Sequence, residues 1–436
     1  MMGSATANGR GEPIEDITTT AALQSPEMAR IADEKIRNSV TAVRNWVEER
    51  NYKGYDPGDG LTSYLRPLTF GNILAERILQ QLVWKAPINI RPLAGIVPME
   101  STKGRGFMAW GYLCLHKVSA DDSDLERALE CLDWLDRAKE AGHIGHCWGN
   151  HFDFTTRTGR MKAHTPTIVW SGLIGQAFLE CYEHTGEDTY LEIAESICRW
   201  ILTLPRETTR NGSCLSYTAR YQHSVHNANL LGAALLARTW RYRARPEYIG
   251  AAREAVRYTC SRQRADGSWL YAEDSQHHWI DNFHTGYILD SLKRYRDATG
   301  DDSCRDSIEQ GYRYFQSVFF EPSGCPRYYH NRTFPIDIQS AAQAIDTFSF
   351  FADERADALN MAKKVAAWTI ANMQDDSGYF YYRRYPLLTA KTPYFHWGQA
   401  TMFKALSHLL LAIGRKDAAV HRSESVSSLA GDGTVY

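Results

Sequence analysis

Two aspartates stand at equivalent points of a repeating sequence, and their carboxyl groups are the first candidates for catalysis. Asp281 lies in the segment HHWIDNFH and Asp337 in FPIDIQS, each just before an apolar stretch. Two carboxyl groups about 5–10 Å apart can act as acid and base in glycoside hydrolysis. Each aspartate could also cap a helix by accepting a backbone N–H. Both interpretations stay open, and Asp281 is the stronger catalytic candidate because its cluster is denser.

Histidines beside these aspartates favour a second chemistry. A lyase or epimerase that acts on a uronic acid removes the proton at C5, next to the carboxylate, and needs a base near neutral pH. It also needs donors that neutralise the carboxylate. Residue pairs that fit these roles are His226 with Asn227, His284 with Asn282, and Tyr382 with Arg383. We expect Asp281 as acid or base and His226 and His284 as base or carboxylate-polarising groups, although lyases, epimerases and hydrolases all use these residue types.

Aromatic and amide side chains recur in the same segments and suit a sugar. Aromatic faces stack on the C–H faces of sugar rings, while polar groups bond the hydroxyls. We expect stacking from Trp148, Trp279 and Trp397, and hydroxyl binding from Asn227, Asn282 and Gln399. The other predicted binding residues are Asp56, Asp59, His146, Asn150, His151, His278, Tyr382, Arg383 and His396.

A repeat of about 55 residues must position these side chains. Loop glycines recur at Gly212, Gly267, Gly324 and Gly378, and an apolar helix is predicted after each loop. Inner helices, apolar on nearly every side, are predicted to begin near residues 107, 165, 226, 282, 337 and 396. Amphipathic outer helices are predicted near 122–139, 187–204, 247–262, 302–318 and 354–373, and the helix near 29–50 can serve as the sixth.

This pattern predicts an all-α fold, an (α/α)6 toroid. A further helix near 69–84 leaves a seven-hairpin ring as the alternative. The long connections, from outer to inner helices, all lie at one end of the ring, which we call the mouth. Eleven of the fifteen histidines fall on this face. Because long loops are usually functional, the mouth is the predicted site.

Composition excludes several classes of function. The 436 residues include 49 Lys and Arg against 51 Asp and Glu, so no basic field favours nucleic acid. No apolar run is long enough to span a membrane. We expect a disordered leader over residues 1–28, a single toroid over 29–414 and a flexible tail over 415–436. Nine cysteines without a CxxC motif or an export signal indicate reduced thiols and a cytoplasmic protein.

No metal or cofactor is predicted. His277, His278, Asp281 and His284 resemble a ligand cluster, but positions 278, 281 and 284 cannot share one helix face well. The sequence has no HExxH or DxDxDG pattern, no dinucleotide or phosphate loop, and no GxSxG elbow. The DxDD acid of toroidal terpene cyclases is also absent, which weakens that alternative.

Three motifs carry a resemblance to a known family. They are GYDPGDGL at 54–61, PINIRPLAGI at 87–96 and HWIDNFHTGYILDSL at 278–292. Over residues 40–412 the chain resembles the α/α-toroid proteins found with polysaccharide-biosynthesis genes, including exopolysaccharide proteins of the VpsJ type. Gly58 departs from the aromatic or acidic residue usual in that turn. The family has no established catalytic residues to carry over.

The resemblance implies a carbohydrate-active enzyme of polysaccharide biosynthesis or processing. Its substrate would be an oligo- or polysaccharide, with an acidic glycan expected. The alternatives are a non-catalytic glycan-binding or assembly protein and a toroidal terpenoid-type cyclase. The sequence leaves the oligomeric state open.

Overall fold

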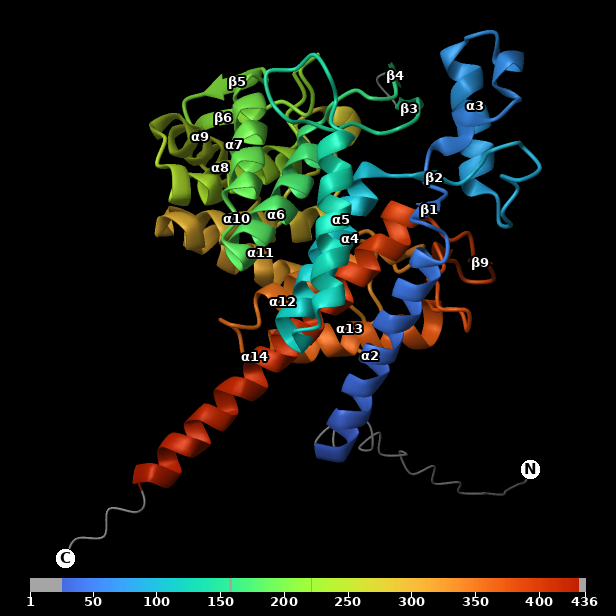
Figure 1. Cartoon of the computed structure of the whole chain (residues 1–436). Helices are drawn as coiled ribbons and strands as arrows, with labels where there is room; N and C mark the ends of the chain where they lie inside the picture. Colours follow the sequence, from blue (N-terminus) through green and yellow to red (C-terminus); the bar gives the residue numbers. More distant parts are fainter. Residues whose placement is uncertain (1–25, 157–158, 221, 431–436) are drawn as a thin grey trace, which may run out of the picture.

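Each repeat of the sequence folds into a pair of helices, and the pairs close into a ring. The computed structural model describes residues 26–156, 159–220 and 222–430. The inner helices are α4 (Thr102–Ser119), α6 (Ile168–Thr185), α8 (His226–Arg243), α10 (Asn282–Thr299), α12 (Ile338–Phe350) and α14 (Ala400–Ala430). Each packs on the next, and α14 packs on α4 (Figure 1). The predicted (α/α)6 toroid is therefore confirmed.

The outer layer also has six helices. They are α5 (Asp122–Arg137), α7 (Asp188–Leu202), α9 (Pro246–Ser261), α11 (Arg305–Val318), α13 (Ala358–Met373) and α2 (Pro26–Glu48). As predicted, the N-terminal α2 completes the ring, because it packs on both α13 and α14. The amphipathic pattern explains the layer: on α7 the buried stripe includes Tyr190, Ile197 and Ile201.

One helix lies outside this count. The helix α3 (Ile73–Lys85) packs mainly on two short 3-10 helices, η2 (Asp59–Thr62) and η3 (Arg66–Thr69), and on strand β3 (Phe154–Thr156). It belongs to the connection between α2 and α4 and stands apart from the ring (Figure 1). The seven-hairpin alternative is wrong, because six inner helices already close the ring.

The long mouth connections carry short antiparallel strands. The strand β1 (Lys53–Gly54) pairs with β2 (Met99–Glu100), and β3 pairs with β4 (Gly159–Met161). In the next connection β5 (Arg206–Thr209) pairs with β6 (Gly212–Leu215). The strands β7 (Ile336–Asp337), β8 (Arg383–Arg384) and β9 (Thr389–Ala390) form a sheet in that order. Short 3-10 turns, η4 (Ser275–His277) and η5 (Asp302–Cys304), and the π-helical turn η6 (Phe395–Gln399) complete the chain.

The four repeat glycines seat these connections on the outer helices. All four have positive φ, between 90° and 115°. A Cβ atom on Gly212, Gly267, Gly324 or Gly378 would lie 2.3–2.7 Å from a backbone carbonyl oxygen, respectively of Glu254, Gln310, Lys364 and Ala42. These four oxygens belong to α9, α11, α13 and α2. Only glycine satisfies both the backbone angle and the close approach.

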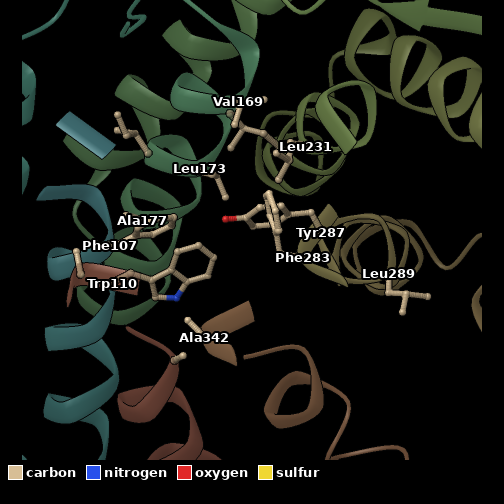
Figure 2. Packing of buried hydrophobic residues seen from close by; sticks show 14 of the residues in the cluster. Phe107, Trp110, Val169, Leu173, Ala177, Leu231, Phe283, Tyr287, Leu289 and Ala342 are labelled. Carbon is tan, nitrogen blue, oxygen red and sulfur yellow. The ribbon is translucent and has the colours of Figure 1, made fainter. Parts of the chain in front are cut away.

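Buried side chains fill the ring on both sides of its axis. Figure 2 shows Phe107, Trp110, Leu173, Phe283 and Tyr287 converging from α4, α6 and α10. At the far end of the axis, away from the mouth, ion pairs replace this apolar layer. The Asp346 carboxylate meets Lys404 Nζ at 2.5 Å and His408 Nδ1 at 2.9 Å, and Glu180 meets Lys117 and Arg238 at 3.1 Å. A cavity of about 230 Å³ lies among the far-end charges, including Glu180 and Arg238.

The chain ends differ from their predicted form where the structure describes them. The predicted leader extends to residue 28, but α2 already begins at Pro26, and residues 1–25 lie outside the described part. The helix α14 continues to Ala430, past the predicted start of a tail at residue 415. No described helix is long and apolar enough to cross a membrane. All nine cysteines are free thiols, and all except the half-buried Cys260 are buried.

A repeat glycine and an open helical glycine yield stability predictions of opposite sign. We expect Gly267→Ala to destabilise the protein by about 2–4 kcal/mol, because alanine is strained at φ 90° and its Cβ meets the Gln310 carbonyl at 2.5 Å. Gly250→Ala, on the open face of α9, should stabilise by about 0.5–1 kcal/mol. Urea unfolding of both variants measures the difference. Equal effects would show that the close approach has no energetic role.

Candidate functional site

The first group of side chains at the mouth surrounds His284 at the head of α10. Asp281 caps this helix: its Oδ1 accepts the backbone N–H of His284 at 3.0 Å. Its Oδ2 lies 2.7 Å from His284 Nδ1 and accepts the Trp279 indole N–H at 2.8 Å. The carboxylate therefore holds the proton on Nδ1, and Nε2 has no hydrogen-bond partner in the described chain. We call Tyr271, Trp279, Asp281, Phe283 and His284 the His284 cluster.

Aromatic rings enclose the His284 imidazole. Its centroid lies 3.9 Å from the Phe283 ring and 4.4 Å from the Tyr271 ring. Tyr271 stacks in parallel on Trp279, with centroids 4.6 Å apart. The imidazole itself remains only half-buried, so its free Nε2 is accessible to a ligand at the mouth.

A second group also places a histidine beside a carboxylate, at His396 in η6, but here the ring nitrogen and the carboxylate oxygen are in contact without a hydrogen bond. Oδ1 of Asp56 accepts the His396 backbone N–H at 2.9 Å, and Oδ2 lies 2.8 Å from His396 Nδ1. The Trp170 ring meets the imidazole edge-on at 5.6 Å, and Lys103 Nζ lies 5.1 Å from the Trp170 centroid. We call Asp56, Lys103, His151, Trp170 and His396 the His396 cluster.

The His396 cluster holds several buried polar atoms without hydrogen bonds, including Asp56 Oδ2 and His396 Nδ1. Burial lowers the pKa of His151 to about 4, so its imidazole is neutral, and neither ring nitrogen has a partner in the described chain. The indole nitrogen of Trp170 is likewise buried and unpartnered. Burial also lowers the pKa of Lys103 to about 8, although Asp56 opposes this shift. Because buried polar atoms normally find partners, these groups indicate a site built for a polar ligand.

The head of α12 lies between the two clusters and connects them. Asp337 caps α12 through the Gln339 N–H at 2.9 Å and accepts the Trp397 indole N–H at 3.0 Å. Its other oxygen pairs with Arg383, whose guanidinium lies 5.1 Å from the Tyr328 ring. The Trp397 ring in turn meets Phe283 edge-on at 5.4 Å. A chain of contacts therefore runs from His284 to the residue beside His396.

Three tyrosines complete the wall with neutral hydroxyl groups. Burial raises the pKa of Tyr217 to about 12 and holds the pKa values of Tyr271 and Tyr328 well above 10. These hydroxyls stay protonated at neutral pH, and they have no hydrogen-bond partner in the described chain. They can bond a ligand hydroxyl, but they are poor bases.

The predicted pairing of Asp281 with Asp337 as acid and base does not fit this geometry. Both oxygens of each carboxylate already accept hydrogen bonds or pair with Arg383. Capping, the other interpretation of both residues, is confirmed. The two carboxylates position a histidine, an arginine and two indoles instead of facing a ligand.

Three predicted binding residues are wrong because they belong to the core or the outer wall. Trp148 is fully buried, donates its indole N–H to Leu135 O at 2.9 Å and stacks on Phe178, so it cannot reach a sugar. His146 bonds Asp136 at 2.9 Å and Ser196 at 2.8 Å, which joins α5 to α7. The Gln399 side-chain amide accepts the Phe380 backbone N–H and donates to the carbonyl oxygens of Phe380 and Tyr394.

Three others shape the mouth without facing it. Asp59 forms a fully buried ion pair with Arg91 at 2.8 Å, which fixes the DPGDG turn. Tyr382 is buried, and its hydroxyl accepts the Trp84 indole N–H at 2.7 Å. Asn150 is buried and accepts the backbone N–H of the next residue at 3.1 Å.

The His226 backbone N–H bonds the Tyr271 carbonyl oxygen at 3.2 Å, but the His226 imidazole contacts other residues than the His284 cluster. This buried imidazole places Nε2 2.9 Å from Glu273 and lies beside Tyr258 of the outer helix α9. Asn227 and Asn282 are buried, and the side-chain amide of Asn282 has no partner in the described chain. His278 is exposed at the rim, 3.1 Å from the Glu273 carbonyl oxygen. The described residues contain no group of three or more His, Cys, Asp or Glu side chains that could hold a metal ion.

Lys103 and Trp170 were not among the predicted site residues. The first inner helix was expected from residue 107, but Ser101 caps it and it begins at Thr102, which places Lys103 at the mouth. Gly104 and Gly106 weaken the helical signal there. Trp170 occupies the third position of α6, as His284 does in α10, so repeat phase was the signal that could have found it.

Comparison with known proteins shows the fold. No family model matches the sequence, and a search of curated proteins finds no match. Among solved structures, cellobiose 2-epimerase from Bacillus thermoamylovorans is 10% identical, with a TM-score of 0.56 over 73% of this chain and 88% of its own. A GH76 α-mannanase from Bacteroides thetaiotaomicron is 14% identical, with a TM-score of 0.56 over 73% and 87%. An unsaturated glucuronyl hydrolase specific for heparin is 12% identical, with a TM-score of 0.58 over 88% and 98%.

Lys103 provides a stability prediction. We expect Lys103→Met to stabilise the protein by about 3 kcal/mol at pH 7, because folding holds the lysine at a pKa of about 8 against 10.5 when exposed. Between pH 8 and pH 10.5 the lysine binds a proton in the unfolded chain but not in the folded one, so the stability of the wild type rises with pH. The difference in stability between wild type and Lys103→Met therefore disappears toward pH 10.5. Urea unfolding at both pH values tests this, with the exposed Lys162→Met as control. A destabilised Lys103→Met variant would contradict it.

Proposed function

We propose that the chain is a sugar epimerase that moves a proton between the two faces of a carbon next to a carbonyl or carboxyl group. One observation carries the proposal: at two mouth histidines, His284 and His396, a carboxylate oxygen lies within 2.8 Å of Nδ1, in a hydrogen bond at His284 and in a charge contact at His396. Such a carboxylate orients the imidazole and stabilises the imidazolium that forms when Nε2 takes up a proton. Inversion at carbon needs two groups of this kind, one for each face.

The carboxylates support this reaction better than glycoside hydrolysis. A hydrolase of the usual two-carboxylate type needs one free acid and one free carboxylate. Asp281 and Asp337 meet neither need, since their oxygens are bonded to indoles, backbone and cationic or imidazole groups. The mouth histidines carry a ring-nitrogen lone pair that can take a proton from carbon.

The roles of the other mouth residues follow from their charge. One imidazole removes the proton from the carbon and becomes an imidazolium, and the other, already protonated, gives a proton to the opposite face. The atoms of the sugar are unchanged overall. Lys103 would stabilise the negative charge that develops on the adjacent oxygen. Neutral His151 and the hydroxyls of Tyr271 and Tyr328 would bond sugar hydroxyls, and the exposed faces of Trp279 and Trp397 would stack on the ring.

The comparisons support a carbohydrate-active enzyme, because structures with this fold are named as mannanases and a glucuronyl hydrolase as well as sugar epimerases. Several structures with this fold are named as sugar epimerases, including a second cellobiose 2-epimerase from Spirochaeta thermophila and a sugar epimerase from a ruminal bacterium. The resemblance of the three sequence motifs to exopolysaccharide proteins indicates a role in the synthesis or processing of an exopolysaccharide. We propose that the substrate is a saccharide from that material.

Exchange of a carbon-bound proton with solvent is the decisive measurement. Wild-type protein in D2O, given reducing disaccharides and uronate-containing oligosaccharides, should incorporate deuterium at one carbon and form an epimer visible by NMR. We expect His284→Gln and His396→Gln each to slow epimer formation by about 10²–10⁴-fold. Each variant should still exchange the carbon-bound proton of one epimer with solvent, because the other base remains. The exposed His143→Gln is the control.

Other products in the same samples would overturn the proposal. New reducing ends without deuterium at carbon would indicate a hydrolase. New reducing ends with the ultraviolet absorbance of an unsaturated uronate would indicate a lyase. Saccharide binding with no change in either epimer or isotope would indicate a binding protein.

Asp281 tests the positioning of His284. In Asp281→Asn, the amide oxygen can still cap α10, so the fold should survive. The amide cannot hold the Nδ1 proton as a carboxylate does, so we expect kcat to fall about 10²–10⁴-fold with little change in KM. Circular dichroism and kinetics on one preparation measure both. Unchanged kcat would remove Asp281 from the mechanism.

Lys103 should set the alkaline limit of activity. If its charge stabilises the transition state, kcat/KM should fall as pH rises through about 8. Lys103→Arg keeps its charge at higher pH, so its profile should stay flat there even if its maximum rate is lower. If kcat/KM of Lys103→Arg falls near pH 8 as it does in the wild type, the titrating group is not Lys103.

A further inference from the structure

Exposed apolar side chains are concentrated in one short part of the chain. Fifteen large hydrophobic residues of the described chain are exposed, and ten of them lie between residues 64 and 97. We call these ten the α3 patch: Tyr64, Leu68, Phe70, Ile73, Leu74, Ile78, Leu82, Ile88, Leu93 and Val97. Phe70 is 92% exposed, far more than a phenylalanine without a partner surface requires.

The patch surrounds a helix with one face open. On α3, Glu76, Gln80 and Val83 are buried, whereas Leu74, Ile78 and Leu82 form an exposed stripe at intervals of four residues. The remaining members lie in the turns before and after α3. Figure 1 shows α3 projecting from the ring, so nothing in the described chain covers this stripe.

Charge around the patch has a single sign. Between residues 61 and 97 the only acidic residue is Glu76. It is buried and paired with Arg66 at 3.1 Å and Arg160 at 2.6 Å. Arg77 and Lys85 border the apolar groove of α3 and have no ion-pair partner in the described chain. An apolar stripe with a basic border and no exposed acid matches an anionic lipid surface.

We propose that the α3 patch docks the protein on the surface of an anionic lipid bilayer. A second copy of the chain fits less well, because a two-fold interface would bring Arg77 and Lys85 close to their own copies. The apolar members also project from the helix and from turns on both sides of it, which suits shallow insertion among lipid headgroups. The connection that carries the patch also supplies Asp56 to the His396 cluster, so docking would hold the mouth near the lipid surface.

Vesicle flotation tests this proposal without reference to the reaction. The full chain should float with vesicles of phosphatidylcholine and phosphatidylglycerol, more weakly with phosphatidylcholine alone, and less as salt rises. We expect Ile78→Glu to weaken binding about tenfold or more. Arg77→Gln and Lys85→Gln should each weaken it about fivefold. Ile144→Glu, at an apolar residue 75% exposed elsewhere, should bind like the wild type.

Three results would overturn the proposal. The first is no flotation of the wild type with anionic vesicles. The second is equal loss of binding in Ile144→Glu and Ile78→Glu. The third is a wild-type dimer, seen by light scattering, that Ile78→Glu dissociates, which would assign the patch to a second copy. Thermal melting of each variant confirms that the fold is intact.

Discussion

The contact of a loop glycine with the backbone of the next outer helix is the constraint on which the rest of the ring depends. Gly212, Gly267, Gly324 and Gly378 place four successive connections against α9, α11, α13 and α2. Each seat fixes where a long connection crosses the mouth. Those connections carry Trp279 and Arg383 and lead into the N-termini of the inner helices. The positions of the polar side chains at the mouth therefore depend on four glycines that have no role in the proposed reaction.

Capping and positioning are joined in the same carboxylates. Asp281 and Asp337 each bond a backbone N–H at the head of an inner helix, an indole N–H, and either an imidazole or a guanidinium. Asp56 likewise accepts the His396 backbone N–H, and its other oxygen lies 2.8 Å from the His396 ring nitrogen. Asp281 and Asp56 each stabilise the element that carries their histidine, whereas Asp337 caps α12 and holds Arg383 and Trp397 of the last connection. The helix ends and the site therefore share one set of interactions.

The sequence predicted the ring well because its signal is periodic and repeated six times, and each repeat corrects errors in the others. The site was harder. His284 and His396 were named, but their pairing with Asp281 and Asp56 depends on side-chain direction, which spacing does not encode. Trp148 occurs in the same phase as the mouth aromatics and yet packs inward, so composition could not separate it from Trp279. Lys103 was missed because two glycines obscured the start of α4.

The ring is completed by the two ends of the chain. The Ser39 hydroxyl of α2 donates to Gln374 Oε1 at 2.7 Å across 335 positions of sequence, and α2 also packs on α14. Closing so large a loop costs entropy that local hairpin contacts do not offset. During synthesis, the face of α2 that packs on α13 and α14 therefore stays uncovered until those two helices have left the ribosome. A circular permutant that joins α2 directly behind α14 would make this contact local and should fold faster.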